Sequence, residues 1–316
     1  MDAVYFLNVG NGDCNIIVHN SGNISVIDIN EIENINEAFE TLNIGNQHKK
    51  DYPDDALAFI KSISNGRRVF RFILTHPDKD HMKGLNKLHV NPGFVNFWSF
   101  SSGKKIEGNV DWDTYKSLNT KKDKNVTAIS PSENEKNKYF NQDENGQAGG
   151  DGLFIICPSN EMKIKAVQED STNNYSYVLK FVANNGKSVL FGGDAQEEEW
   201  DYIMKNHASD IKDIDLLISP HHGRKIENLG KALDIINPKV SLLGNFPSEY
   251  GSYDFYNKRQ LKHYTNNELG SVKIDFSDDG SISYFCTNKN AANTINGNES
   301  SQIKTVGGLT FYKIDI

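Results

Sequence analysis

The segment Thr75–His81, with the sequence THPDKDH, concentrates metal-binding side chains at the end of an apolar stretch. The preceding residues, 69–74, have the pattern of a short buried β-strand, and residues 82–88 have helical character. A loop at a strand end points successive side chains beyond the sheet edge, where imidazoles and carboxylates can bind zinc, iron or manganese. An exposed polar turn is the alternative, but the density of the group favours a metal site. Its members are His76, Asp78, Asp80 and His81.

Two further strand ends carry the same residue types. Asp194 follows the apolar stretch 188–191 and a Gly-Gly pair, which lets the backbone pass close to an ion. It could also cap a helix expected at residues 196–207. His221 and His222 follow another apolar stretch and precede a glycine. We interpret one of these two imidazoles as a metal ligand and the other as a group that supports a ligand or meets the substrate.

Strands and helices alternate along most of the chain. Strands are expected at residues 4–9, 15–19, 24–29, 69–74, 153–157, 175–182, 188–191, 215–219, 240–243, 272–276, 281–285 and 309–314. Helices are expected at residues 31–42, 54–63, 196–207, 229–236 and 255–264. This pattern indicates an α/β protein with two sheets flanked by helices.

The chain is expected to form a single domain over residues 1–316. Between residues 103 and 152, Lys, Asn, Asp and Gly dominate and the apolar periodicity is lost. This predicts a polar insertion with too few apolar residues for a core of its own. Residues 265–316 are expected to form an extension of strands around a hairpin turn at residues 277–280.

The composition predicts a folded protein that is not exported. Of the 316 residues, 37% are hydrophobic and 24% charged, which excludes wholesale disorder. No apolar stretch approaches the ~20 residues that span a bilayer and no signal-like segment opens the chain, so a cytoplasmic location without membrane contact is expected. The net charge of −8 argues against unspecific wrapping of nucleic acid. Three cysteines without metal-binding spacing fit buried thiols in a reducing compartment: Cys14, Cys157 and Cys286.

Taken together, these segments resemble the metallo-β-lactamase superfamily. THPDKDH is similar to its His-x-His-x-Asp-His signature, with Asp78 in place of the second His. The His-x-Asp-x-Asp-His form resembles the soluble domain of the DNA-uptake competence protein ComEC and its free-standing relatives. Other segments agree with that subfamily in kind and order: FLNVGNGD at 6–13, VID at 26–28, NNYSYVL at 173–179, GGDA at 192–195 and PHHG at 220–223. The resemblance implies an αββα four-layer sandwich of two mixed β-sheets flanked by helices.

The resemblance also implies a centre with two divalent metal ions, Mn²⁺ or Zn²⁺, with Mg²⁺ as a further option. One ion would be held by His76, Asp78 and Asp194. The other would be held by Asp80, His81, Asp194 and either His221 or His222. Asp80 would be the catalytic carboxylate, which orients an attacking hydroxide and accepts a proton. The many oxygen ligands favour Mn²⁺ over Zn²⁺.

Five more residues are candidates for contact with the ligands or the substrate. Asp28 ends a predicted strand and is expected to brace the metal loop, whereas Asp13 fits a site role or a simple turn. Asn174 lies in the segment that resembles the strand replacing the superfamily's third His motif. Arg224 and Lys225 stand where the subfamily usually carries Ser. They could neutralise charge on a substrate, or they could belong to an exposed loop.

The favoured function is a metal-dependent phosphodiesterase or nuclease that cleaves DNA or RNA with a hydroxide activated by two metals. One alternative is a hydrolase of a small phosphodiester such as a cyclic nucleotide. Another is a non-catalytic metal-binding partner protein in a defence or repair system. A strand-binding surface is conceivable from the lysines and aromatic residues at positions 104, 105, 121, 122, 124, 98, 100 and 112, but an exposed loop with core tryptophans is the favoured explanation. The expected partner is thus a nucleic acid or nucleotide, and a protein partner stays open.

Overall fold

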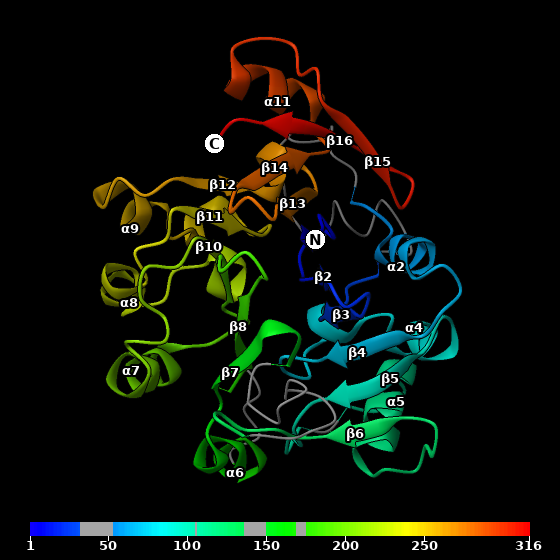
Figure 1. Ribbon diagram of the computed structural model, residues 1–316. Coiled ribbons are helices and arrows are strands. Elements are labelled where there is room, and N and C mark those ends of the chain that lie inside the picture. The colour runs from blue at the N-terminus through cyan, green and yellow to red at the C-terminus, as the bar shows by residue number, and fades with distance from the viewer. Residues whose placement is uncertain (32–52, 105, 136–149, 169–174) are drawn as a thin grey trace.

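The computed structural model of the protein describes residues 1–31, 53–104, 106–135, 150–168 and 175–316. Two β-sheets face each other, and helices cover the outer face of each sheet (Figure 1). This is the αββα four-layer arrangement that the sequence predicts, and both sheets are mixed.

The first sheet has ten strands in the order β15-β16-β14-β13-β1-β2-β3-β4-β5-β6. Neighbours from β3 to β6 run parallel, and the other pairs are antiparallel. The strands are β1 (Asp2–Phe6), β2 (Asn15–Val18), β3 (Ile24–Ile27), β4 (Val69–Ile73), β5 (Phe94–Trp98), β6 (Thr127–Ile129), β13 (Val272–Phe276), β14 (Ile282–Cys286), β15 (Ile303–Val306) and β16 (Leu309–Ile314).

The second sheet has six strands in the order β12-β11-β10-β9-β8-β7. Strands β9 to β12 run parallel, while β7, β8 and β9 are antiparallel. Helices cover the outer face of the parallel part, so β9, β10 and β11 are buried on both faces and consist almost wholly of apolar residues. The strands are β7 (Leu153–Cys157), β8 (Val178–Val182), β9 (Ser188–Phe191), β10 (Leu216–Ile218), β11 (Val240–Leu243) and β12 (His263–Thr265).

The helices form the two outer layers. Beside the first sheet lie α2 (Ala56–Ser64), α4 (Leu85–Val90) and α5 (Val110–Asn119), and beside the second lie α7 (Glu197–Asn206), α8 (Leu229–Ile236) and α9 (Tyr253–Lys258). Within the described ranges, no helix combines the length and apolar character needed to cross a bilayer. Shorter or peripheral helices are α3 (Lys79–Met82), α6 (Asn160–Gln168), α10 (Asn266–Leu269), α11 (Lys289–Asn296), η1 (Gly150–Gly152), η2 (Pro220–Gly223) and η3 (Ser248–Tyr250).

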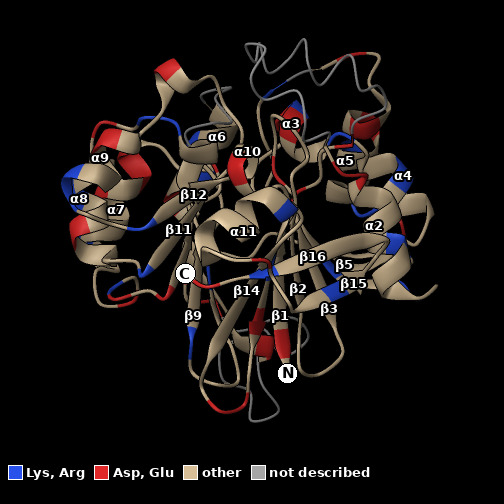
Figure 2. Ribbon diagram, turned by 90° about the horizontal axis from the view of Figure 1, so that it is seen from above, with Lys and Arg blue, Asp and Glu red and all other residues tan. Residues whose placement is uncertain are grey.

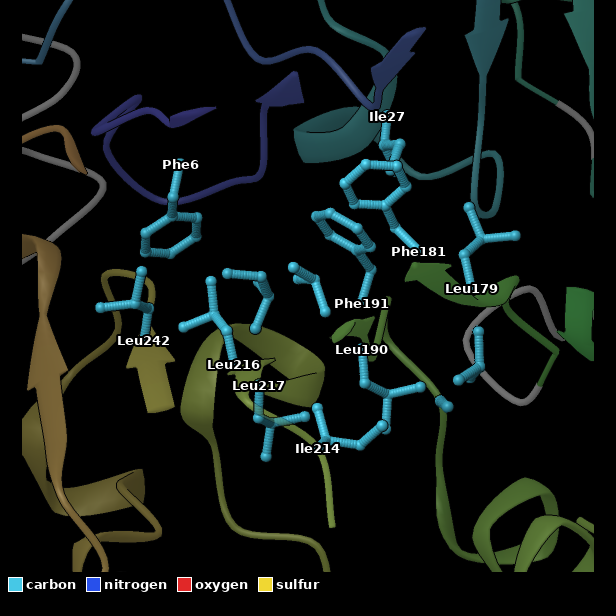
Figure 3. Packing of buried hydrophobic residues seen from close by; sticks show 14 of the residues in the cluster. Phe6, Ile27, Leu179, Phe181, Leu190, Phe191, Ile214, Leu216, Leu217 and Leu242 are labelled. Carbon is cyan, nitrogen blue, oxygen red and sulfur yellow. The ribbon is translucent and has the colours of Figure 1, made fainter. Parts of the chain in front are cut away.

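Apolar side chains from both sheets fill the space between them (Figure 3). Phe6 and Ile27 of the first sheet belong to one buried cluster with Phe181, Phe191 and Leu242 of the second. Burying each such side chain contributes roughly 1.5–3 kcal/mol, so this layer holds the two sheets in a fixed relation. The strand ends that carry the polar motifs are positioned by this packing.

The stretch 103–152 departs from the polar insertion that its composition predicts. It contains α5 and β6, and β6 pairs with β5 as the outermost strand of the first sheet. Trp112, Tyr115 and Leu118 recur at intervals of three and bury one face of α5. At least residues 110–129 are therefore built into the first sheet and its helix layer, because a few large side chains at helical spacing suffice to bury a face.

Other boundaries shift by a few residues. The helix expected at 255–264 ends at Lys258, and the edge strand β12 follows it. The polar run before the last strand contains α11 and β15, which the sequence does not predict. The helix expected at 31–42 lies almost wholly outside the described residues. All three cysteines are buried and free.

Candidate metal centre

The polar motifs meet at one end of the two sheets. Strand β4 ends at Ile73 and leads through the loop into α3, which lies at the end of the molecule opposite the N-terminus (Figure 2). In the second sheet β9 and β10 are parallel, with Phe191 paired to Ile218, so the loops that follow both strands leave the sheet side by side. Side chains at the carboxyl ends of such strands converge on one crevice.

The backbone around Asp194 is tightly packed. Gly193 has φ +50°, and a Cβ there would lie 2.4 Å from Ser176 Oγ, so a side chain is excluded. The carbonyl of Gly193 accepts a hydrogen bond from the backbone N–H of His221 at 2.7 Å. His221 and His222 both have left-handed backbones, with φ of 51° and 58°. Such conformations cost about 1–3 kcal/mol each and cluster at functional sites.

Four imidazoles converge on the carboxylate of Asp194. The Nε2 atoms of His81 and His222 lie 3.3 and 3.8 Å from its Oδ1. The Nε2 atoms of His76 and His221 lie 3.7 and 3.9 Å from its Oδ2. Asp194 therefore divides the centre into two halves, one at each of its oxygens.

Asp78 and Asp80 fall into different halves. Asp78 Oδ2 lies 3.8 Å from Nε2 of His76, on the Oδ2 side of Asp194. Asp80 Oδ2 lies 3.4 Å from Nε2 of His222, on the Oδ1 side. The structure thus brings together all seven residues that the sequence proposes as metal ligands.

The far nitrogens of three imidazoles are held by oxygen atoms. Nδ1 of His81 lies 2.8 Å from Asp28 Oδ2, and Nδ1 of His222 lies 3.1 Å from Asp13 Oδ1. Nδ1 of His76 lies 3.1 Å from Thr75 Oγ1, whose hydroxyl donates to Asp28 at 2.6 Å. These acceptors keep the ring proton on Nδ1, which turns the Nε2 lone pair towards the centre, as a metal ligand requires.

His221 differs from the other three. Gln196 Nε2 lies 2.9 Å from both the carbonyl of Asp194 and Nδ1 of His221. Only the NH₂ group can donate to a carbonyl, so we assign its second hydrogen to Nδ1 of His221. This places the His221 ring proton on Nε2. The side chain of His221 is also 20% exposed, whereas that of His222 is 1% exposed.

The centre leaves buried polar atoms unsatisfied. Nε2 of His76, His81 and His222 and Oδ1 of Asp194 have no hydrogen-bond partner among the residues that the structure describes. An unsatisfied buried group costs about 1–3 kcal/mol, so four at one point indicate a missing common partner. Three nitrogen lone pairs and a carboxylate oxygen are donors that divalent cations accept.

Four residues each offer one potential ligand atom, and these four atoms all lie within 4.8 Å of one another. The residues are Asp13, His81, Asp194 and His222. Asp13 meets the Nδ1 side of the His222 ring, away from the centre. We therefore interpret Asp13 as a carboxylate that braces His222 and Asp28 as its counterpart for His81 and His76.

Neighbouring charges shift the protonation of these groups. Burial would lower the pKa of His222, but Asp194 and Asp13 outweigh it and raise the pKa to about 10. The pKa of His81 is raised for the same reason, by Asp194, Asp28 and Asp80. Burial would raise the pKa of Asp194, but the imidazoles, led by His81, hold it well below its usual range. Without a metal, protons on imidazoles balance the carboxylates.

The remaining candidates lie at the rim or outside the described residues. Arg224 Nη2 is 3.5 Å from Asn11 Oδ1, and the Lys225 ammonium lies 5.7 Å from the centre of the Phe255 ring. Asn174 lies outside the residues that the structure describes. Sequence reasoning missed Gln196 and the contact of Lys104 with Asp78, since neither belongs to a recognisable motif.

No protein-family model matches this chain, and no curated protein does. Among solved structures it is similar to Igni18, a metallo hydrolase from the hyperthermophilic archaeon Ignicoccus hospitalis, with 15% identity over 87% of this chain and 100% of that chain and a TM-score of 0.47. For Tm1679, a metal-dependent hydrolase of the β-lactamase superfamily, the identity is 13%, the coverage 88% and 100%, and the TM-score 0.46.

The chain is also similar to the metallo-β-lactamase fold protein YhfI from Bacillus subtilis, with 11% identity over 83% of this chain and 95% of that chain and a TM-score of 0.41. Identities and TM-scores of this size carry no conclusion about activity. The ComEC-like subtype stays a prediction, and the function has to be argued from the side chains of the centre.

Proposed function

We propose that this protein is a metal-dependent hydrolase that cleaves phosphodiesters, with a nucleic acid as the favoured substrate. The observation that carries the proposal is the carboxylate of Asp194, whose two oxygens each face a separate set of imidazole and carboxylate atoms. A single carboxylate between two ligand sets is what a pair of divalent cations needs as a bridge.

Each half of the centre would hold one cation. His76, Asp78 and Asp194 supply one set, and Asp80, His81, His222 and Asp194 supply the other. When bound, the cations supply Lewis-acid stabilisation of negative charge and a nucleophile at neutral pH. With three carboxylates among the ligands, the centre suits Mn²⁺ or Mg²⁺ better than a His-rich site would.

Asp80 is the carboxylate best placed to act on the substrate. Its side chain is 34% exposed, compared with 15% for Asp78 and 4% for Asp194. Burial would raise the pKa of Asp80, but His81 and His222 outweigh it and keep the pKa below its ordinary range. In the proposed reaction a water oxygen bonds to phosphorus, Asp80 takes up its proton, and the P–O bond to the leaving oxygen breaks.

His221 is assigned a role towards the substrate. Its proton on Nε2 faces the Oδ2 half of the centre, and part of its ring is accessible to solvent. It can therefore donate a hydrogen bond to a phosphate oxygen, while His222, buried and braced by Asp13, presents a lone pair.

The test is cleavage of single-stranded DNA, double-stranded DNA, RNA and a cyclic dinucleotide after removal of metals and reloading with Mn²⁺ or Zn²⁺. We expect turnover with at least one phosphodiester, faster with Mn²⁺, and a loss of about 10³-fold or more in Asp80→Ala. A nucleic acid substrate should show a steep salt dependence, whereas a cyclic dinucleotide should not. Full turnover by Asp80→Ala would refute the assigned mechanism.

A matched pair of variants separates the two adjacent histidines. His222→Ala should lose bound metal, measured by elemental analysis, whereas His221→Ala should keep both ions and lose turnover. Equal metal loss in both variants would contradict the assignment of His221.

A further inference from the structure

Lys104 lies at the mouth of the metal centre and contacts one of its carboxylates. Its ammonium donates a hydrogen bond to Oδ1 of Asp78, while Oδ2 of the same carboxylate faces His76. The Lys104 side chain is 32% exposed, so its charge reaches the solvent side of the centre. Ser102 Oγ accepts a hydrogen bond from the backbone N–H of Lys104 at 3.0 Å, which fixes the start of this side chain.

Arg224 approaches the centre from the second sheet. It follows η2, and an isolated β-bridge to Gly251 fixes its backbone. Its guanidinium reaches Asn11 at 3.5 Å, while its Nε is buried and has no hydrogen-bond partner within the described part of the chain. The backbone N–H of Arg224 donates to the carbonyl of His221 at 2.8 Å, so Arg224 is tied by a tight turn to the histidine that faces Oδ2 of Asp194.

Each of the two cationic residues is therefore bonded to a residue on the Oδ2 side of Asp194. Lys104 contacts the carboxylate of Asp78, and Arg224 is held to His221 through the backbone. A carboxylate at position 78 in place of an imidazole adds negative charge where an anionic substrate would enter. The ion pair with Lys104 offsets that charge and holds an ammonium at the entrance.

We propose that Lys104 and Arg224 hold the non-bridging oxygens of the substrate's phosphate at the Oδ2 half of the centre, and that Asp78 positions Lys104. This inference rests on the proposed phosphodiesterase function and adds how the phosphate is oriented and why an anionic substrate is required. The guanidinium offers a planar pair of donors and the ammonium a compact charge, so together they match a tetrahedral phosphate. Neutral esters, lactams and lactones lack the negative charge that these two cations would attract.

The first test measures binding of inorganic phosphate to the Mn²⁺-loaded protein by calorimetry, together with metal content and KM for a dinucleotide. Lys104→Gln and Arg224→Gln should each weaken phosphate binding and raise KM about tenfold or more, with both ions retained. Arg224→Lys should lie between Arg224→Gln and the wild type. The matched control is Lys79→Gln, an exposed lysine next to Asp80 whose side chain makes no hydrogen bond or ion pair with any described residue.

The second test is a double-mutant cycle on Asp78 and Lys104. Asp78→His restores a metal-ligating imidazole but removes the oxygen that holds Lys104, so it should keep the metal and lose phosphate affinity. Adding Lys104→Gln to Asp78→His should then cost little more, because the two residues act as a unit. Additive losses would overturn the positioning role of Asp78.

The outcomes distinguish this inference from the proposed function. If wild-type protein cleaves phosphodiesters but the Lys104 and Arg224 variants bind phosphate as the wild type does, the cation pair is refuted and the function stands. If no phosphodiester is cleaved, the proposed function fails. Weaker phosphate binding in both variants would then still support an anion site. If Lys79→Gln weakens phosphate binding as much as Lys104→Gln and Arg224→Gln do, the effect is one of overall charge, and the proposed pair of cations is refuted.

Discussion

Strands β3 and β4 carry a buried polar cluster at each end, and the two clusters are completed in different ways. At the end opposite the metal centre, Arg71 donates to Ser25 Oγ at 2.9 Å and to Asp151 Oδ2 at 3.0 Å. His19 Nε2 lies 2.7 Å from the same Ser25 hydroxyl. Here the chain supplies its own cation between the sheets. At the metal centre, carboxylates and imidazoles face each other with several atoms unsatisfied.

The pKa of one histidine in each cluster illustrates this difference. Burial and the charge of Arg71 lower the pKa of His19 to about 3, although Asp151 opposes this. His222 is equally buried, yet Asp194 and Asp13 raise its pKa to about 10. The pKa values of these two buried imidazoles are thus shifted in opposite directions, because one has a cation beside it and the other has carboxylates. The carboxylates around His222 therefore make the metal centre favourable for cations.

The largest expected effect comes from removing the shared carboxylate. Asp194→Asn keeps the size of the side chain but removes the charge that would bridge two cations. We expect loss of both metal ions by elemental analysis and a fall in turnover of about 10³-fold or more, a larger effect than losing one hydrogen-bond donor. If the variant retained two ions, metal binding would not depend on the negative charge of Asp194, and the contrast between the two clusters would be refuted.

The opposite cluster should respond in stability and leave metal binding unchanged. Arg71→Met leaves the carboxylate of Asp151 without its cationic partner, and breaking such a buried ion pair costs about 3–5 kcal/mol of unfolding free energy. Chemical denaturation of the metal-free protein measures this loss. Adding Asp151→Asn should restore part of it, while the metal content of each folded variant stays at the wild-type value. A metal loss equal to that of Asp194→Asn would show that the two ends are coupled.

A smaller effect is expected from Asp28, which braces His81 and, through Thr75, His76. Asp28 has φ +59°, a conformation that asparagine tolerates, so Asp28→Asn should leave the backbone in place. The amide cannot accept as many hydrogen bonds as the carboxylate, and metal affinity should fall about 10–100-fold. A metal-binding titration checks this, with Asp151→Asn as a control that should bind metal normally.

Many of the strands that carry the two clusters could be predicted from the sequence, but the contacts within the clusters could be predicted only in part. The strands at 153–157, 188–191, 240–243 and 309–314 match β7, β9, β11 and β16 because buried runs bounded by turns have a strong pattern. The polar residues before β7, including Asp151, gave no sign of a buried pair with Arg71. That pair joins residues 80 positions apart, and local sequence carries no information about such a contact.

At the metal centre, too, contacts between residues far apart in the sequence could not be predicted. His76, Asp80, His81 and Asp194 stand in short motifs at strand ends, so their places in the chain could be predicted. Their convergence depends on how the two sheets that carry β4 and β9 pack against each other. The roles of His221 and His222 could not be separated, because they depend on Gln196 and Asp13, which reach them from other elements. The contact between Lys104 and Asp78 was equally invisible, since it needs the folded path of the loop after β5.

The last expected effect is the pH dependence of metal binding, and it follows from the raised pKa values at the centre. A pKa of about 10 for His222 lies above its ordinary 6.5. In the metal-free fold, its proton therefore adds stability that is complete below pH 6.5 and is lost as pH rises through 10. A cation that takes the Nε2 lone pair must displace this proton, and the raised pKa of His81 gives it the same requirement.

Apparent metal affinity should then rise about tenfold per pH unit for each proton released. Calorimetry at pH 7.5 in buffers of different ionisation heat should detect release of at least one proton per protein, decreasing above pH 10. Binding without proton release at pH 7.5 would mean that the imidazoles are already neutral, and the contrast with His19 would disappear.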